Sequence, residues 1–207
     1  MIKKNLVSII MPTYNAEHFI RNSIGSVQDQ SYGNWELIIV DDCSTDDTIA
    51  IIDSYKDERI RLIKLPVNQG AAIARNTALE KVSGEYIAFL DSDDLWHQEK
   101  LEKQLSFMLE NDYLFTSTDY AEINESGEEL GTVIKSHAKL DYEGVLKYCP
   151  GNSTVMYNAK ELGVFFIPDI KKRNDFEFSA AWDTYCQTTD MLHFRPHIPM
   201  LTGKGPW

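Results

Sequence analysis

Four short runs of β-branched and aliphatic residues alternate with three helical patterns over the first 91 residues, and this alternation restricts the possible folds. The runs are "LVSIIMP", "WELIIVDD", "IRLIKLP" and "EYIAFLD". Between them, apolar residues recur at helical spacing, as at Ile20, Ile24 and Val27. Because parallel strands need a crossover between them, this order predicts an α/β fold with a mostly parallel sheet and helices on its faces.

The pattern after residue 95 is less regular. "HQEKLEKQLSFMLEN" predicts an amphipathic helix with Leu101, Leu105 and Met108 on one face. "NESGEELG" indicates a turn, and "NSTVMYNAKEL" a strand that leads into a helix. We therefore expect one domain over residues 1–207, with a first half to about 95 and a second half over about 96–180. The atypical tail, about 181–207, is rich in proline and glycine near its end.

Polar side chains follow three of the four predicted strands, in "PTYN", "DDCSTD" and "DSDD". Open α/β sheets bind their ligands beyond the carboxyl ends of the strands. Loops are commonly polar, but carboxylate pairs at two strand ends of one sheet exceed that expectation. The sequence thus predicts a shared ligand site at this edge.

Asp91, Asp93 and Asp94 crowd three carboxylates into four positions at the end of the fourth strand. Asp91 and Asp93 suit a hard divalent cation, which takes one or two carboxylates together with substrate phosphates. A bound metal would also remove their mutual repulsion. Asp94 could hydrogen-bond a ribose or the backbone. The alternative is a helix N-cap, for which one aspartate would suffice.

Asp41 and Asp42 end the second strand, and Tyr14 follows the first. A carboxylate can accept a hydrogen bond from a uracil or guanine ring N–H, and a tyrosine ring can stack on a base. Together they outline a nucleotide pocket. Ordinary packing is the alternative for Tyr14. Capping of the next helix is the alternative for the aspartates, although Ser44 and Asp47 stand at capping-box spacing there.

The formal net charge of -12 argues against a nucleic-acid partner, because phosphate backbones select basic surfaces. An acidic protein that binds a phosphorylated ligand needs a positive group between them, such as a divalent metal. Arg75 could reach a phosphate or brace the carboxylates; an exposed helix salt bridge is equally compatible with its spacing. The sequence contains neither the dinucleotide-binding glycine fingerprint nor a P-loop.

We expect neither a membrane-spanning helix nor a signal peptide. No apolar run approaches the roughly 18 residues that a membrane-spanning helix needs, and the start has too short an apolar core for a signal peptide. The 3 cysteines, an odd number at scattered spacing, indicate free thiols. A cytoplasmic protein is the expectation.

Four ordered stretches, "VSIIMPTYN", "IIVDDCSTDDT", "NQGAAIARN" and "GEYIAFLDSDDLW", closely resemble the successive motifs of family 2 glycosyltransferases. The resemblance implies the GT-A fold, a Rossmann-like sheet with a smaller mixed acceptor-side region after a nucleotide-sugar-binding half. It also implies an inverting hexosyltransferase that moves a sugar from a nucleotide-sugar donor, with UDP expected, to a hydroxyl group. The expected acceptor is a saccharide or lipid-linked saccharide in cell-surface polysaccharide synthesis, with peripheral association at the inner face of the membrane.

The resemblance also implies roles for the residues of the nucleotide pocket. Pro12 and Tyr14 would shape the base pocket, with Tyr14 against the uracil. Asp42 would accept the base ring N–H, with Asp41 alongside. Arg75 would lie near the diphosphate.

The metal site and the base follow from the resemblance in the same way. Asp91 and Asp93 would form the D-x-D motif that holds Mn²⁺ or Mg²⁺ on the diphosphate. Asp175, in "KKRNDF", would be the base that deprotonates the acceptor. From the residues alone, a surface carboxylate paired with the preceding basic side chains is the alternative for Asp175.

After Asp175 the chain departs from the family pattern, so other readings stay open. One is a catalytically impaired or truncated nucleotide-sugar-binding protein of the same fold. A receiver-type signalling domain would share the acidic pair, but it would begin with that strand and lack "PTYN". A D-x-D phosphatase fits "DSDDLW" poorly, because its motif lies on the first strand.

Overall fold

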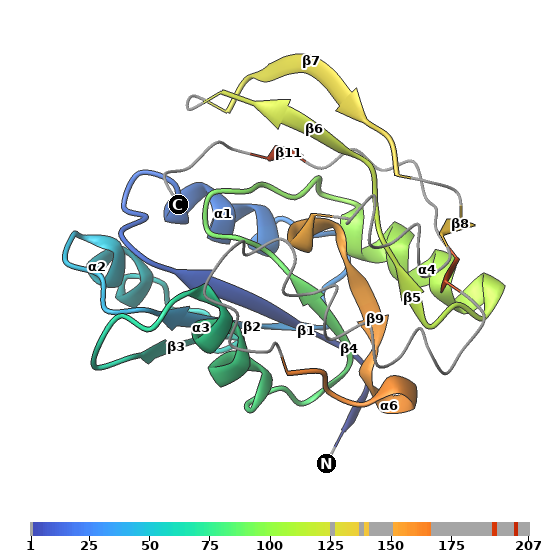
Figure 1. Cartoon of the computed structure of the whole chain (residues 1–207), viewed down its shortest axis with the longest axis horizontal. Coiled ribbons are helices and arrows are strands. Elements are labelled where there is room, and N and C mark those ends of the chain that lie inside the picture. The colour runs from blue at the N-terminus through green and yellow to red at the C-terminus, as the bar shows by residue number, and fades with distance from the viewer. Residues whose placement is uncertain are drawn as a thin grey trace.

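A computed structural model describes residues 2–124, 127–136, 139–140, 151–166, 192–193 and 201–202. The first half alternates strands and helices as the sequence predicts (Figure 1). Through residue 111 the elements are β1 (Lys3–Thr13), α1 (Ile20–Gln28), β2 (Trp35–Asp41), α2 (Thr48–Asp53), β3 (Ile60–Lys64), α3 (Ala71–Leu79), β4 (Gly84–Phe89) and α4 (Lys100–Asn111). The described part of the second half contains β5 (Phe115–Thr116), β6 (Tyr120–Ile123), β7 (Glu129–Ile134), β8 (Lys139–Leu140), the 3₁₀ turn η1 (Asn152–Thr154), β9 (Met156–Asn158), α6 (Ala159–Leu162), β10 (Leu192–His193) and β11 (Leu201–Thr202).

The main sheet has six strands in the order β3-β2-β1-β4-β9-β5. The strands β1 to β4 are parallel, whereas β9 runs antiparallel to both β4 and β5. The expected mostly parallel sheet is therefore confirmed. Since β9 pairs directly with β4, the second half of the chain extends the same sheet.

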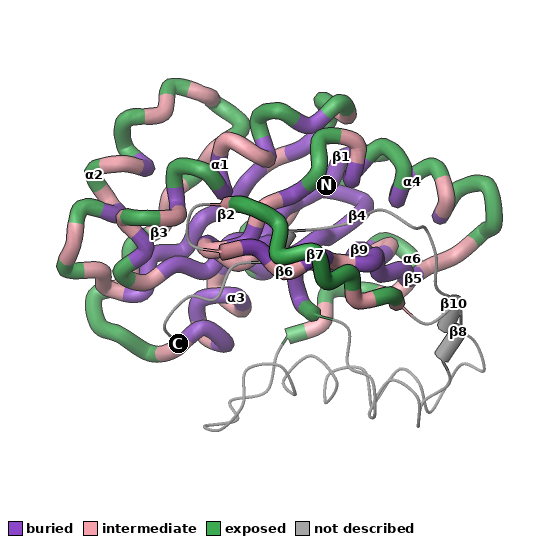
Figure 2. Tube along the Cα trace, turned by 90° about the horizontal axis from the view of Figure 1, so that it is seen from above, coloured by how far each residue is buried: buried purple, intermediate pink, exposed green. Residues whose placement is uncertain are grey.

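Alternating side chains of the strands supply an apolar core on each face of this sheet. On one face Val7, Ile9 and Met11 of β1 pack with the buried stripes of α1 and α4. On the other face Ile10 packs with α3 and α6. Figure 2 shows the buried trace concentrated in the central strands, with exposed segments around it. The predicted stripes on α1 and α4 are buried as expected.

The turn expected at "NESGEELG" lies between β6 and β7, which pair antiparallel and form a hairpin. Together with β11 they form a second, three-stranded sheet in the order β11-β6-β7. This hairpin lies above the main sheet in the view of Figure 1. The three-stranded sheet is a smaller mixed region of the kind that the family resemblance implies for the second half.

The predicted capping box before α2 is wrong. The helix begins at Thr48, and its N-cap residue Asp47 makes no side-chain cap bond. The Ser44 hydroxyl instead accepts the backbone N–H of Asn15 at 2.9 Å. A partner about 30 residues away in sequence thus takes the group that local spacing assigned to the helix, and it ties together the loops after β1 and β2.

Within the part of the chain that the structure describes, no helix is both long and apolar enough to cross a membrane.

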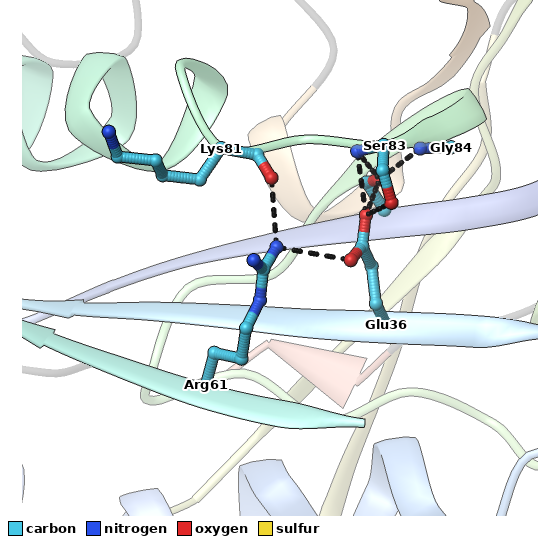
Figure 3. A network of polar contacts seen from close by, with 6 residues as sticks. Glu36, Arg61, Lys81, Ser83 and Gly84 are labelled. Carbon is cyan, nitrogen blue, oxygen red and sulfur yellow. Dashed lines mark hydrogen bonds and ion pairs between the residues drawn. The ribbon is translucent and has the colours of Figure 1, made fainter. Parts of the chain in front are cut away.

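A polar network joins the amino ends of β2 and β4, away from the predicted ligand edge. The Glu36 carboxylate accepts hydrogen bonds from the Ser8 hydroxyl at 2.6 Å, from Ser83 and from Arg61 (Figure 3). The Ser8 hydroxyl in turn accepts the Gly84 N–H at 2.9 Å. The chain packs so closely here that a Cβ on Gly84 would lie 2.5 Å from the Leu6 carbonyl oxygen.

We predict that Gly84→Ala lowers the free energy of unfolding by about 2 kcal/mol, because the methyl group meets backbone atoms that cannot move aside. Urea denaturation measures the effect. Gly25→Ala in α1 is the control, since its Cβ would have no atom within 4 Å. That change should stabilise the protein by about 0.5 kcal/mol. Equal stabilities of the two variants would contradict the packing described at Gly84.

Candidate functional site

The carboxyl ends of β1, β2 and β4 meet at one edge of the sheet. Thr13, the last residue of β1, pairs in register with Asp41, the last residue of β2. The next residue, Asp42, donates its backbone N–H to the Thr13 carbonyl at 2.8 Å. On the other side of β1, the Leu90 N–H binds the Ile10 carbonyl at 3.0 Å just before Asp91. The three polar segments that the sequence singles out are therefore neighbours.

The Asp42 carboxylate also anchors the loop that leads into α3. Its two oxygens accept the backbone N–H groups of Gln69 at 2.8 Å and Gly70 at 2.7 Å. Gly70 has a φ of 93°, which favours glycine, and α3 begins at the next residue. A carboxylate here satisfies amide donors at a positive helix end. For Asp42, sequence reasoning considered capping only of α2, so it missed this contact with the residues before α3.

Asp41 is completely buried, and only part of its carboxylate is satisfied. One oxygen accepts the Ser44 N–H at 3.0 Å. The other oxygen has no hydrogen-bond partner among the described residues, and neither has the hydroxyl group of Thr13, which pairs with Asp41 in register. Unsatisfied buried polar atoms are costly, so a polar ligand group or water that reached either atom would be stabilising.

Pro12 and Tyr14 flank Thr13 at the end of β1. Pro12 is buried within the strand, opposite Val40. Tyr14 is half-buried and lies just beyond the strand, so its ring is partly accessible. Asn15 follows with a φ of 48° and accepts the Thr45 N–H at 2.8 Å. These contacts hold the loop after β1 against the loop after β2.

A buried ion pair connects α3 to the end of β4. The Arg75 guanidinium contacts the Asp91 carboxylate at 2.7 Å, with side-chain exposures of 4% for Arg75 and 25% for Asp91. The Nε and Nη1 atoms of Arg75 have no hydrogen-bond partner within the described ranges. Of the alternatives that the sequence left open for Arg75, the structure shows a brace on the carboxylates; an exposed helix salt bridge is wrong.

The three aspartates of the β4 loop differ in their surroundings. Asp94 is 8% exposed and accepts the Ser153 hydroxyl at 2.5 Å. Asp91 pairs with Arg75, and Asp93 between them is half-buried. No group of three or more metal-ligating side chains gathers in the described part of the chain. The donor set of Asp91 and Asp93 nevertheless fits a hard cation that takes further oxygens from a diphosphate.

Two residues near this loop were not singled out by their sequence pattern. Ser153, in η1, contacts the loop through its hydroxyl and its carbonyl group. Lys100, at the start of α4, is fully buried with its amine 3.8 Å from the centre of the Trp96 ring. Burial lowers the pKa of Lys100 well below its usual range.

Asp175, the predicted base, lies outside the described residues.

We predict that Asp91→Ala lowers the free energy of unfolding by about 3 kcal/mol, because it leaves the buried guanidinium of Arg75 without its acidic partner. Denaturant titration of the single and double variants measures this. Arg75→Met should cost less, since Asp91 remains partly in contact with water. Adding Arg75→Met to Asp91→Ala should restore part of the lost stability. A double variant less stable than Asp91→Ala alone would contradict the account that the unpaired buried guanidinium causes the loss of stability.

Comparison with known proteins matches the sequence of this chain to one family. The family model described as "Glycosyl transferase family 2" matches residues 8–165. The Bacillus subtilis "Putative teichuronic acid biosynthesis glycosyltransferase TuaG" is 46% identical over 182 residues, which cover 86% of this chain and 71% of that protein. The Escherichia coli "UDP-Glc:alpha-D-GlcNAc-diphosphoundecaprenol beta-1,3-glucosyltransferase WfgD" is 45% identical over 170 residues, or 82% of this chain and 66% of that one.

Solved structures show the same fold at lower identity. Staphylococcus aureus TarS in complex with UDP-GlcNAc aligns with a TM-score of 0.78 at 22% identity, over 97% of this chain and 59% of the TarS chain. A Pyrobaculum calidifontis mannosyltransferase in complex with GDP-Man and Mn²⁺ aligns with a TM-score of 0.70 at 19% identity, over 94% of this chain and 56% of that one. This chain thus spans less than two thirds of these solved chains. The GT-A fold is confirmed, and the chain belongs to glycosyl transferase family 2.

Proposed function

We propose that this domain transfers a hexosyl group, with inversion, from a UDP-sugar to a hydroxyl group of a saccharide or lipid-linked saccharide in cell-surface polysaccharide synthesis. The observation that carries the proposal is the line of contacts along one sheet edge. Thr13 contacts Asp42, Asp42 holds the start of α3, and Arg75 of α3 contacts Asp91. The base-facing and metal-facing groups are thereby held in one connected unit.

The nucleotide end of the donor would lie at the ends of β1 and β2. Tyr14 would pack against the uracil, with Pro12 shaping the pocket beside it. Asp42 would accept the ring N–H through lone pairs left beside its backbone contacts, with Asp41 alongside. The choice of UDP is supported by WfgD, whose name specifies UDP-Glc, and by TarS, which was solved with UDP and with UDP-GlcNAc.

The diphosphate would lie at the end of β4. Asp91 and Asp93 would hold Mn²⁺ or Mg²⁺ there, and Arg75 would add a second positive group near the phosphates. A metal at this position supplies Lewis-acid stabilisation of the departing diphosphate. The Mn²⁺ in the complex of the mannosyltransferase of the same fold supports this assignment. Arg75 meanwhile keeps Asp91 oriented, because its guanidinium is buried and cannot turn away.

The reaction on the acceptor side would use Asp175 as general base. Its carboxylate takes the proton of the acceptor hydroxyl as that oxygen forms a bond to the anomeric carbon. The bond between the anomeric carbon and the diphosphate oxygen breaks at the same time, and UDP leaves with the electron pair. One displacement inverts the configuration. The lipid-linked acceptor in the name of WfgD supports an acceptor presented at the inner face of the membrane, to which this domain would bind peripherally.

We predict that the protein binds UDP more tightly with Mn²⁺ than without it, and that Asp93→Ala weakens the metal-dependent part by roughly tenfold or more. Titration calorimetry with UDP, with and without Mn²⁺, measures this. Asp29→Ala, an exposed carboxylate at the end of α1, is the matched control and should bind as the wild type does. If UDP does not bind under any metal condition, the UDP assignment is wrong.

An assay of sugar release, with the wild type and Asp175→Asn, tests the role of Asp175 as general base. Asp175→Asn should retain UDP binding and lose turnover by about a hundredfold or more. Unchanged turnover would remove Asp175 from this role. An intact protein that binds UDP with Mn²⁺ but transfers no sugar would instead support the impaired nucleotide-sugar-binding alternative.

A further inference from the structure

Ser153 lies where the second half of the chain meets the loop that carries Asp91 and Asp93. It belongs to η1, immediately before β9, which pairs with β4 in the main sheet. Its side chain is not on the surface, since the residue is only 2% exposed. The residue is separated from the loop by about 60 positions in sequence, so the contact depends on the tertiary fold.

Three hydrogen bonds connect this one residue to the loop. The Ser153 hydroxyl accepts the backbone N–H of Asp91 at 2.9 Å and donates to the Asp94 carboxylate at 2.5 Å. Its backbone carbonyl accepts the indole N–H of Trp96 at 2.9 Å. The contacts therefore lie on both sides of Asp93 along the chain, while Asp93 is not among them.

These contacts have a definite direction. The hydroxyl proton goes to Asp94, which leaves the hydroxyl lone pairs for the Asp91 N–H. Asp94 is thereby oriented toward Ser153. The Asp91 carboxylate is oriented separately by Arg75. Of the three crowded aspartates, two are thus held by neighbours that come from η1 and α3.

The rest of η1 is held in turn by α4 and β5. Gln104 donates to the Thr154 carbonyl at 3.0 Å and to the Thr116 carbonyl at 3.1 Å. The loop itself is held on its other side by α1, because the Ser23 hydroxyl donates to the Ser92 carbonyl at 2.7 Å. Ser153 therefore joins the loop, through η1, to α4 and β5.

We propose that Ser153 is a positioning residue for the metal-binding loop, an inference that rests on the proposed function. It holds the Asp91 backbone and the Asp94 carboxylate in place, so that the carboxylates of Asp91 and Asp93 face the diphosphate without rearrangement when the metal binds. Groups that orient metal ligands in this way contribute to metal affinity although they do not touch the metal. Asp94 takes part as the partner of Ser153, rather than as a ligand or a ribose contact.

The test compares Ser153→Ala with Ser8→Ala. Ser8 is a matched control, because it is also buried, donates to a carboxylate and accepts a backbone N–H, but at the opposite end of the sheet. In the presence of saturating UDP, Ser153→Ala should weaken Mn²⁺ binding about tenfold or more. Ser8→Ala should leave the Mn²⁺ affinity unchanged, although this variant should unfold at a lower urea concentration than the wild type. Ser153→Thr, which keeps the hydroxyl group, should restore much of the affinity.

Amide hydrogen exchange gives a second readout that needs neither metal nor nucleotide. The amide of Asp91 should exchange faster in Ser153→Ala than in Ser8→Ala. Wild-type Mn²⁺ affinity in Ser153→Ala beside normal UDP binding would overturn the positioning role and leave the proposed function intact. An equal loss of Mn²⁺ affinity in Ser8→Ala would overturn it too, because general destabilisation would then explain the effect. If the intact protein binds no UDP with Mn²⁺, the proposed function fails, and the metal-loop role fails with it.

Discussion

A buried guanidinium governs the arrangement of the acidic edge of this sheet. Arg75 contacts Asp91 from α3, which packs on the opposite face of the sheet from α4. Its side chain is almost completely shielded from water. A charge in such a place is tolerated only when its partner stays in contact. This requirement determines where α3 can lie relative to β4. The Asp42 carboxylate binds the two residues that precede α3, Gln69 and Gly70. The position of α3 is therefore also linked to the end of β2.

The edge is thus built from mutually dependent contacts. Asp42 satisfies the amides before α3, α3 presents Arg75, Arg75 orients Asp91, and Ser153 holds the backbone of Asp91. Asp42, Arg75 and Ser153 are buried, and Asp91 is partly exposed, so these contacts are largely shielded from competing water. A nucleotide diphosphate and its metal would therefore meet groups that are already oriented, which reduces the ordering that binding requires.

Local pattern was sufficient for much of the fold. The strand runs and apolar stripes predicted β1 to β4, α1 and α4, because the burial of one face imposes a period on the sequence. The carboxylates at strand ends also predicted correctly that the polar segments after β1, β2 and β4 meet at one edge of the sheet. Membership of family 2 excludes the receiver and phosphatase readings, which depended on single short motifs.

Contacts between distant residues could not be predicted in this way. Ser44 is at the right spacing to cap α2, yet Asn15 takes its hydroxyl group. Local spacing offers Asp42 as a cap only for the next helix, α2, yet its carboxylate accepts hydrogen bonds from the loop before α3. Ser153 stands in an ordinary polar stretch, and its importance follows from β9 pairing with β4. In each case tertiary packing selects a partner to which local spacing does not point.

The most direct measurement of the central claim is the position of Mn²⁺ in crystals of the protein grown with UDP and Mn²⁺, read from anomalous diffraction at the manganese edge. The account predicts a single strong peak about 2.2 Å from a carboxylate oxygen of Asp93, with the uracil beside Tyr14 at the ends of β1 and β2. A metal bound away from the β4 loop, or a base bound elsewhere on the domain, would contradict it.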